Sequence, residues 1–169
     1  MNRRRTLGTM LIAIAVAGVT RSEMMLKGQS YQPYSEGKVS KEKVDKALAK
    51  ARSQQKFLMV EFGANWCEDC VVLAQTLEKA DTKKYFKSHF EVLRVDVGRF
   101  DRNLEIAKTL GVEMTAIPTA VFYAPDGERV GATNKGELEP ARKYGSKQIY
   151  EFLKDIAERR LITNPATKS

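Results

Sequence analysis

Cys67 and Cys70 are the two cysteines of this chain, and two residues separate them. A structural disulfide across so short a segment would close a very small loop, so it would add little stability by restricting the unfolded chain. A pair at this spacing suits thiol–disulfide exchange instead, in which one thiolate attacks a disulfide and a second thiol resolves the mixed disulfide. The sequence therefore indicates redox chemistry at Trp66-Cys67-Glu68-Asp69-Cys70.

The two cysteines lie where a strand is expected to give way to a helix. Residues 57–62 form a short apolar run typical of a buried strand, and after Cys67 the apolar residues Val71 and Leu77 recur at helical spacing. The unpaired N–H groups and partial positive charge of a helix N-terminus stabilise a thiolate there. We therefore predict that Cys67 is the nucleophile and that Cys70, one turn later, is the resolving cysteine.

Metal binding is the main alternative use of two cysteines. A structural zinc site needs about four nitrogen or sulfur ligands, and beyond the cysteines the sequence offers His89, on the far side of an expected helix. We predict no resident metal and no other cofactor. Two thiolates suffice for copper(I), so a copper-handling protein is a second interpretation. A binding module that uses the region around the cysteines without turnover is a third interpretation.

The elements around the cysteines alternate between helix and strand. Apolar residues at helical spacing predict an amphipathic helix over residues 40–53, with Ser40 as its N-cap, and another over residues 146–161. The further expected elements are a short helix with Tyr85 and Phe86 that Asp81 caps, a strand over 90–96, a helix over 103–110, and a hairpin of strands 119–124 and 128–132. This order predicts an α/β fold with a mixed central sheet and helices on both faces.

The first residues have the composition of an export signal. Arginines at positions 3–5 precede an apolar stretch that ends near small residues at positions 15–17. The apolar stretch, residues 7–19, has 13 residues, whereas a helix across the hydrocarbon core needs about 20, so we expect no stable membrane span. We predict a signal peptide over residues 1–17, cleaved or kept as a tether, and export to the periplasm. A helix that belongs to the fold is the alternative.

The rest of the chain is expected to form one domain and to be a monomer. Residues 18–39 are expected to be a linker, 40–162 the domain and 163–169 a tail. The chain has 29 basic and 21 acidic residues, a net charge of +8, which becomes +5 without the three arginines of the signal. The basic residues are dispersed among acidic ones rather than gathered in a stripe, so we predict no nucleic-acid partner.

Two segments carry a resemblance to a known family. Residues 62–70, Phe-Gly-Ala-Asn-Trp-Cys-Glu-Asp-Cys, resemble the active-site segment of the thioredoxin superfamily, and residues 116–119, Ala-Ile-Pro-Thr, resemble its cis-proline loop. The resemblance covers about residues 40–160 and extends to small exported thioredoxin-family proteins and the C-terminal periplasmic domain of the DsbD-type reductase. It implies a thioredoxin-like fold and a protein-disulfide oxidoreductase. Its partners would be protein thiols or disulfides and a redox partner protein.

The resemblance also implies roles for residues near the cysteines. Trp66 would border the substrate groove, Pro118 in the cis form would pack against the disulfide, and Ile117 would offer backbone hydrogen bonds to an extended substrate. A proline directly before an apolar strand has no N–H for the ladder, and the cis form of an X–Pro bond costs only about 0.5–1 kcal/mol. An ordinary trans proline at the start of a strand is the alternative.

Glu61 is an acid inside the apolar run of residues 57–62. By the resemblance, it occupies the place where thioredoxins carry a buried acid six residues before the first cysteine. Burial disfavours the charged form, so the pKa of this carboxyl should be raised. We hypothesise that Glu61 shuttles a proton to or from Cys70. A carboxylate that points to solvent at a strand edge is the alternative.

Glu68 and Asp69 stand where many thioredoxins have Gly-Pro between their cysteines, and Val71 stands where a lysine is usual. Negative charge here opposes the helix dipole and raises the pKa of the attacking thiol, which favours a reductant or electron carrier over a strong oxidant. If both side chains are well solvated, their influence is small. The loops over residues 97–102 and 133–145 are interpreted as surface loops, either of which could recognise a partner.

Overall fold

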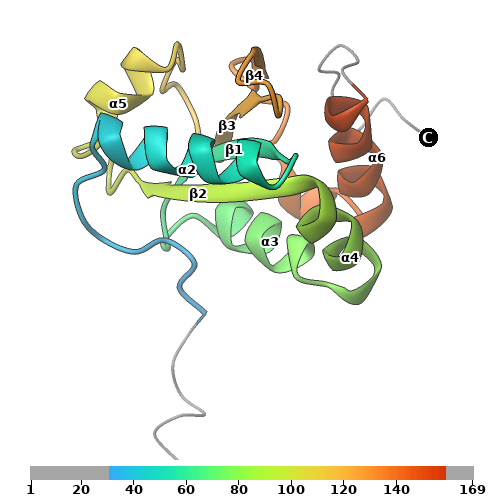
Figure 1. Cartoon of the computed structure of the whole chain (residues 1–169). Helices are drawn as coiled ribbons and strands as arrows, with labels where there is room; N and C mark the ends of the chain where they lie inside the picture. The colour runs from blue at the N-terminus through green and yellow to red at the C-terminus, as the bar shows by residue number, and fades with distance from the viewer. Residues whose placement is uncertain (1–30, 159–169) are drawn as a thin grey trace, which may run out of the picture. The chain divides into compact units, whose positions relative to one another are not determined.

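The structure is a computed structural model that describes residues 31–158. Its elements follow the order α2 (Lys41–Ser53), β1 (Phe57–Gly63), α3 (Glu68–Leu77), α4 (Ala80–His89), β2 (Phe90–Asp96), α5 (Leu104–Thr109), β3 (Thr119–Tyr123), β4 (Arg129–Ala132), the 3-10 helix η1 (Ala141–Lys143) and α6 (Ser146–Ala157) (Figure 1). The expected signal peptide, most of the expected linker and the expected tail lie outside the described residues. Within residues 31–158, no helix is both long and apolar enough to cross a membrane.

The central sheet has the strand order β2-β1-β3-β4. Strand β1 runs parallel to β2 and antiparallel to β3, which pairs in turn with β4 as the expected hairpin. Because β1 has a neighbour on each side and helices on each face, all seven of its residues are buried. In this register Glu61 lies between Arg94 of β2 and Ala120 of β3. The mixed sheet of the expected α/β fold is confirmed.

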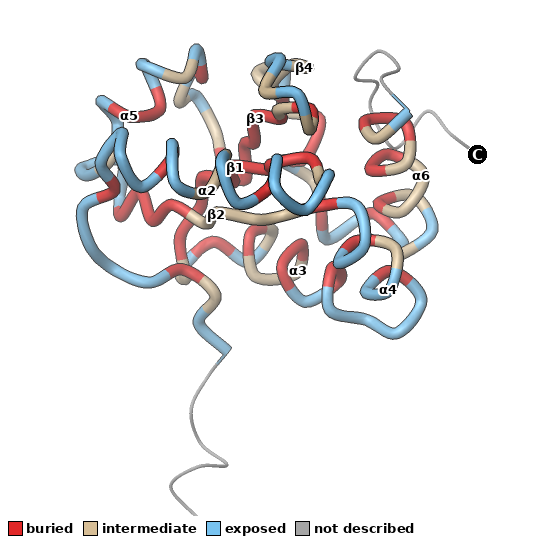
Figure 2. The backbone as a smooth tube through the Cα atoms, in the orientation of Figure 1, coloured by how far each residue is buried: buried red, intermediate tan, exposed pale blue. Residues whose placement is uncertain are grey.

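Two apolar layers flank this sheet, because alternate residues of a strand point to opposite faces. On one face, Leu58, Val60 and Phe62 of β1 pack with α2 and α5. On the other, Phe57 and Met59 pack with α3, α4 and α6. Figure 2 shows the buried stretches of these helices turned toward the strands, while their outer surfaces are exposed. Glu61 belongs by its position to the same face as Met59, beneath α3.

Residues 31–39, the N-terminal strap, form part of the domain rather than a free linker. Tyr34 is 1% exposed and Val39 is 6% exposed, and both belong to the core that includes α2. The described part of the segment expected to be a linker therefore packs into the fold. Sequence periodicity gave no signal for it, because the strap is neither helix nor strand.

The helix starts differ from expectation in small ways. Ser40 is the N-cap residue of α2, but its side chain makes no capping hydrogen bond. Lys79, not Asp81, is the N-cap residue of α4. Asp81 lies in the first turn instead, where its negative charge complements the partial positive charge of the helix N-terminus.

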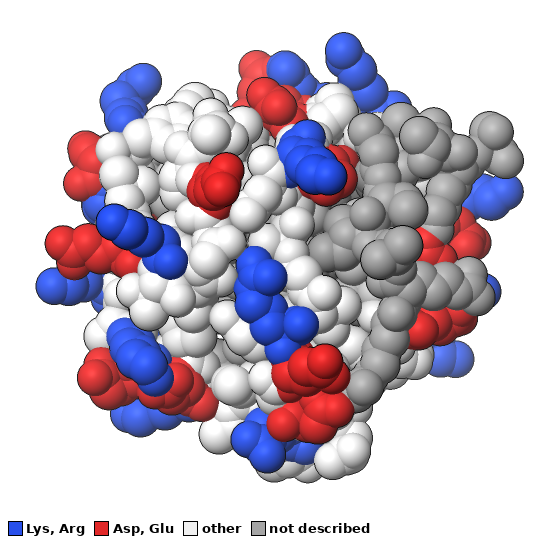
Figure 3. Space-filling model, turned by 90° about the horizontal axis from the view of Figure 1, so that it is seen from above, with Lys and Arg blue, Asp and Glu red and all other residues white. Residues whose placement is uncertain are grey.

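Basic and acidic side chains are interspersed on the face of the molecule drawn in Figure 3. Several of the described charges form ion pairs across or within elements, such as Lys41 with Asp45 and Lys50 with Glu91. On this face, charges of opposite sign therefore lie close to one another.

Candidate active site

Cys67 and Cys70 lie at the junction of β1 and α3. Cys67 is the N-cap residue of α3, and its Sγ accepts a hydrogen bond from the backbone N–H of Cys70 at 3.3 Å. The Cys67 thiol also faces the carbonyl oxygen of Ile117 at 3.7 Å. Both cysteines are free thiols and both are buried, Cys70 completely. A helix N-terminus thus holds the two sulfur atoms in the geometry that the spacing predicted.

The two thiols differ in acidity. The pKa of Cys67 is lowered, mainly because the thiol of Cys70 donates a hydrogen bond to its sulfur and backbone N–H groups add to this. The pKa of Cys70 is raised strongly, first by burial and then by its neighbour Cys67. The thiolate therefore forms more readily at Cys67 than at Cys70.

The two acids between the cysteines, Glu68 and Asp69, both form ion pairs with Arg142. The charge of Asp69 raises the pKa of Cys67, as expected, but the hydrogen bonds from Cys70 outweigh this effect, so the pKa of Cys67 is lowered overall. Arg142 of η1 binds both acids: its backbone N–H donates to Asp69 Oδ1 at 2.8 Å, its Nε lies 3.1 Å from Asp69 Oδ2, and its Nη1 pairs with Glu68. The loop of residues 133–145 thereby reaches the active site.

Glu61 is fully buried between two hydrogen-bond donors. The hydroxyl of Tyr34 donates to Oε1 at 2.5 Å, and Nε of Arg94 donates to Oε2 at 3.1 Å. Burial raises the pKa of Glu61, while the charge of Arg94 and the Tyr34 hydrogen bond oppose that rise. The expected desolvation is confirmed, and the alternative of a solvent-facing carboxylate at a strand edge is wrong.

Pro118 follows a cis peptide bond from Ile117. This turn faces the cysteines, since the Ile117 carbonyl lies against the Cys67 sulfur. A groove of about 490 Å³ lies here, and its lining includes Trp66, Cys67, Phe100, Ile117 and Arg142. The structure therefore brings Trp66, Cys67 and Ile117 together, as expected of a site that holds an extended polypeptide.

Trp66 stands at the wall of this groove with 49% of its surface exposed. Its indole N–H donates to the carbonyl oxygen of Gly98 at 2.6 Å, and Cζ of Arg99 lies over the ring, 5.6 Å from its centroid. Phe100 packs edge-on against it, with ring centroids 6.5 Å apart. Phe100 adopts φ 62°, a left-handed conformation that is unfavourable for a bulky side chain. The loop of residues 97–102 thus forms the aromatic wall.

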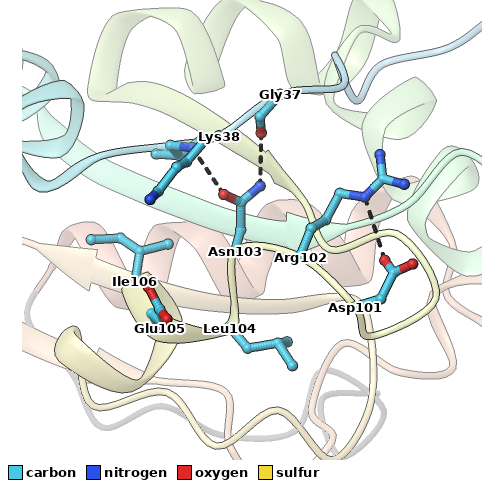
Figure 4. A pocket seen from close by; sticks show the side chains of 9 residues that line it. Gly37, Lys38, Asp101, Arg102, Asn103, Leu104, Glu105 and Ile106 are labelled. Carbon is cyan, nitrogen blue, oxygen red and sulfur yellow. Dashed lines mark hydrogen bonds and ion pairs between the residues drawn. The ribbon is translucent and has the colours of Figure 1, made fainter.

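A larger pocket of about 670 Å³ lies away from the cysteines, between the strap and the start of α5 (Figure 4). Asn103 spans it: its Nδ2 donates to the carbonyl oxygen of Gly37 at 2.9 Å, and its Oδ1 accepts from the N–H of Val39 at 2.9 Å. We interpret these bonds as an anchor for the strap. Within residues 31–158, no group of three His, Cys, Asp or Glu side chains could hold a metal ion.

Comparison with known proteins places this geometry in a family. The model of a family described as thioredoxin-like matches residues 40–125. The chain belongs to the thioredoxin-like family. A thioredoxin-like protein with a Cys67–Cys70 pair in this arrangement is a thiol–disulfide oxidoreductase.

Individual relatives of this thioredoxin-like protein agree with that assignment. A disulphide isomerase from Xylella fastidiosa Temecula1 is a similar solved structure, with 38% identity, a TM-score of 0.70, and coverage of 75% of this chain and 97% of that chain. Thioredoxin H4 of Arabidopsis thaliana is 37% identical over 94 residues, 54% of this chain and 73% of the relative. A protein disulfide-isomerase of Schizosaccharomyces pombe is 25% identical over 116 residues, 68% of this chain but 31% of the relative.

Four residues at the thioredoxin-like site had no assigned role from the sequence: Tyr34, Arg94, Phe100 and Arg142. Arg94 had a signal, because β1 and β2 are parallel strands of equal length and their alignment pairs it with Glu61. Tyr34 lies 27 residues before Glu61, and Arg142 lies 74 residues after Glu68. Residues so distant in sequence come together only through the tertiary fold.

Proposed function

We propose that this protein is an exported disulfide reductase or electron relay, which acts on protein disulfides through Cys67 and Cys70. The observation that carries the proposal is the opposite shift of the two thiols, with the pKa of Cys67 lowered and that of Cys70 raised. An enzyme of this kind needs one sulfur ready to attack and another that stays protonated until it is needed.

The reaction takes two steps. Cys67 thiolate attacks one sulfur of a client disulfide, so that a mixed disulfide forms and the first client thiolate leaves. Cys70 then loses its proton to the buried carboxylate of Glu61 and attacks Cys67 Sγ, which releases the second client thiolate. The client gains two electrons and the Cys67–Cys70 pair is left as a disulfide. A redox partner protein must then return two electrons to that disulfide.

The client occupies the groove beside Cys67. An extended segment would lie along the Ile117–Pro118 turn, where backbone groups can pair with it, and Trp66 would cover its side chains. Trp66 is suited to this because its indole is fixed at one edge by Gly98 and exposed at the other. This assignment rests on the position of the three residues around the sulfur of Cys67.

The reducing direction is supported by the acids between the cysteines. Asp69 opposes the thiolate of Cys67, and a less stable thiolate means a less stable reduced pair and a lower reduction potential. Arg142 limits this influence by pairing with both acids. A reduction potential near the roughly −120 mV of oxidising DsbA-type proteins, rather than the roughly −270 mV of thioredoxin, would overturn the reducing direction.

Export to the periplasm, cleaved or tethered, is supported by the basic and then apolar composition of residues 1–17. A domain similar to the C-terminal periplasmic part of the DsbD-type reductase would receive its electrons there from a partner protein. Cell fractionation with periplasmic and cytoplasmic marker enzymes tests the location, and recovery of the protein with the cytoplasmic marker would contradict it.

Trapping of mixed disulfides tests the function itself. We expect the wild type to reduce insulin with a dithiol as electron source, and Cys70→Ser to accumulate client proteins on Cys67 that dithiothreitol releases, because the resolving sulfur is gone. Cys67→Ser is the matched control and should trap nothing. A wild type that binds clients without reducing them, or equal trapping by both variants, would contradict the proposal.

A further inference from the structure

Tyr34 of the strap packs against β1, the strand that leads to the redox cysteines. Its side chain is buried and lies directly against the backbone of Gly63. A Cβ atom added at Gly63 would lie 2.4 Å from Cζ of Tyr34, which is far inside van der Waals contact. The glycine therefore leaves a slot in β1 that the tyrosine ring fills.

Asn65 fixes the backbone of the same tyrosine. Its Oδ1 accepts from the N–H of Tyr34 at 3.0 Å, and its Nδ2 donates to the carbonyl oxygen of Tyr34 at 2.7 Å. Residues 61, 63 and 65 are alternate positions on the way to Cys67, and all three contact Tyr34. Three alternate residues of the segment that leads to Cys67 therefore contact the same residue of the strap.

A second anchor holds the strap a few residues further along. Asn103, shown in Figure 4, binds the carbonyl of Gly37 and the N–H of Val39, and its Nδ2 also donates to the carbonyl oxygen of Asp96 at 2.7 Å. Because Asn65 and Asn103 hold the backbone of the strap, we expect Tyr34 to stay in place when its hydroxyl is removed. The hydroxyl then acts mainly on Glu61, to which it donates its hydrogen bond.

We propose that Tyr34 is a positioning residue of the redox site, whose hydroxyl holds Glu61 as an oriented carboxylate ready to take the proton of Cys70. This inference rests on the proposed proton transfer from Cys70 to Glu61. In that step the S–H bond of Cys70 breaks, an O–H bond forms on Glu61, and the Cys70 sulfur bonds to Cys67 Sγ. The bond between Cys67 Sγ and the client sulfur breaks, and its electron pair leaves with the client thiolate.

The charged and titratable groups that face Glu61 come from three elements. The strap supplies Tyr34, β2 supplies Arg94, and α3 supplies Cys70, whose own pKa is raised in part by the charge of Glu61. The neighbour of Glu61 in β3 is Ala120, which does not titrate. Arg94 and Tyr34 each donate to a different carboxylate oxygen, so loss of the tyrosine hydroxyl leaves one oxygen buried without its donor.

Tyr34→Phe in the full-length protein tests this role, because the ring still fills the slot over Gly63. With one equivalent of a chromogenic aromatic disulfide, the first chromophore reports attack by Cys67 and the second reports resolution by Cys70. We expect the first phase to be unchanged and the pH midpoint of the second to rise by about one to two pH units. Tyr31→Phe, at an exposed tyrosine of the same strap, should match the wild type.

A direct titration separates this role from the enzyme activity. In the reduced protein, the side-chain carboxyl of Glu61 labelled with carbon-13 should titrate at higher pH in Tyr34→Phe than in the wild type. Adding Tyr34→Phe to Glu61→Gln should not change the second kinetic phase further. If Glu61→Gln slows resolution but Tyr34→Phe leaves both midpoints at their wild-type values, the role of Tyr34 is refuted and the proposed function stands. A wild type without disulfide exchange would instead refute the proposed function.

Discussion

Glu61 shows how one residue can be costly to the fold and useful to the chemistry. A carboxylate with no exposed surface loses its hydration, and the Tyr34 and Arg94 hydrogen bonds replace only part of it. The residual penalty appears as a raised pKa. A raised pKa makes a carboxylate a better proton acceptor than an ordinary glutamate, since its pKa lies closer to that of the thiol that gives up the proton.

Glu61→Gln is expected to remove a pH dependence of stability. Because the folded-state pKa is raised, Glu61 is protonated in both states at low pH and ionises first in the unfolded state as the pH rises. Between the unfolded and folded pKa values, each pH unit then lowers the free energy of unfolding by up to about 1.4 kcal/mol. Denaturant unfolding of the reduced protein should show the wild type losing stability relative to Glu61→Gln from about pH 4 upward. Parallel pH curves would contradict this.

At the scale of elements, a loop and a short helix complete the site that β1 and α3 begin. The loop of residues 97–102 supplies the aromatic wall, and η1 brings Arg142 to the acids at the start of α3. Arg142 is 53% exposed and Glu68 is 74% exposed, so solvent weakens their attraction. Asp69 is 15% exposed, and it accepts a hydrogen bond from the backbone N–H of Arg142 and forms an ion pair with its guanidinium, which makes it the stronger partner.

Arg142→Ala is expected to change redox properties more than stability. Without the guanidinium, the negative charge of Asp69 acts more fully on the Cys67 thiolate, so the pKa of Cys67 should rise and the reduction potential should fall. The loss of stability should stay below about 1 kcal/mol, as is usual for exposed pairs. Thiolate absorbance against pH and equilibration with glutathione measure the two quantities. Lys143→Ala, in the same short helix, is the control, and an equal shift in both variants would count against a specific pairing.

At the scale of the whole molecule, the domain includes a strap that crosses from α2 to the redox site. The strap is fixed at two points: Asn65 holds it near the cysteines, and Asn103 holds it at the start of α5. Its buried residues, Tyr34 and Val39, share one core with Cys67 and Cys70. Folding of the strap and formation of the active site are therefore linked.

Shortened chains should reveal this link. A protein that begins at residue 40 lacks Tyr34 and Val39, so we expect it to be less stable than one that begins at residue 31 by more than about 3 kcal/mol, the usual cost of losing a buried aromatic side chain. Chemical denaturation of the two reduced proteins gives this difference. Tyr31→Ala in the longer protein should have little effect because Tyr31 is exposed. Equal stability of the two proteins would mean that the strap is dispensable.

Local patterns in the sequence were sufficient for the regular elements and for the two cysteines. Apolar spacing located β1, β2, α2 and the β3–β4 hairpin to within a residue or two of their observed ends. The placement of Cys67 at a helix N-terminus followed from the same patterns, because strand, turn and helix signals are read over short stretches of chain. The burial of Glu61 was expected from the resemblance and from its apolar neighbours in the strand, and the structure excluded the solvent-facing alternative.

Only the tertiary structure decided what surrounds those residues. Tyr34 lies on an irregular segment with no periodicity, and it reaches Glu61 through a slot that Gly63 leaves in another element. Arg142 pairs with Glu68 and Asp69, whose charges the sequence placed beside the thiols, while hydrogen bonds from Cys70 lower the pKa of Cys67. Such balances depend on distances between atoms far apart in sequence, and electrostatic influence changes steeply with distance and burial. The sequence by itself therefore identified the two sulfur atoms expected to react, and the fold decided which groups surround them and Glu61, because those groups come from distant parts of the chain.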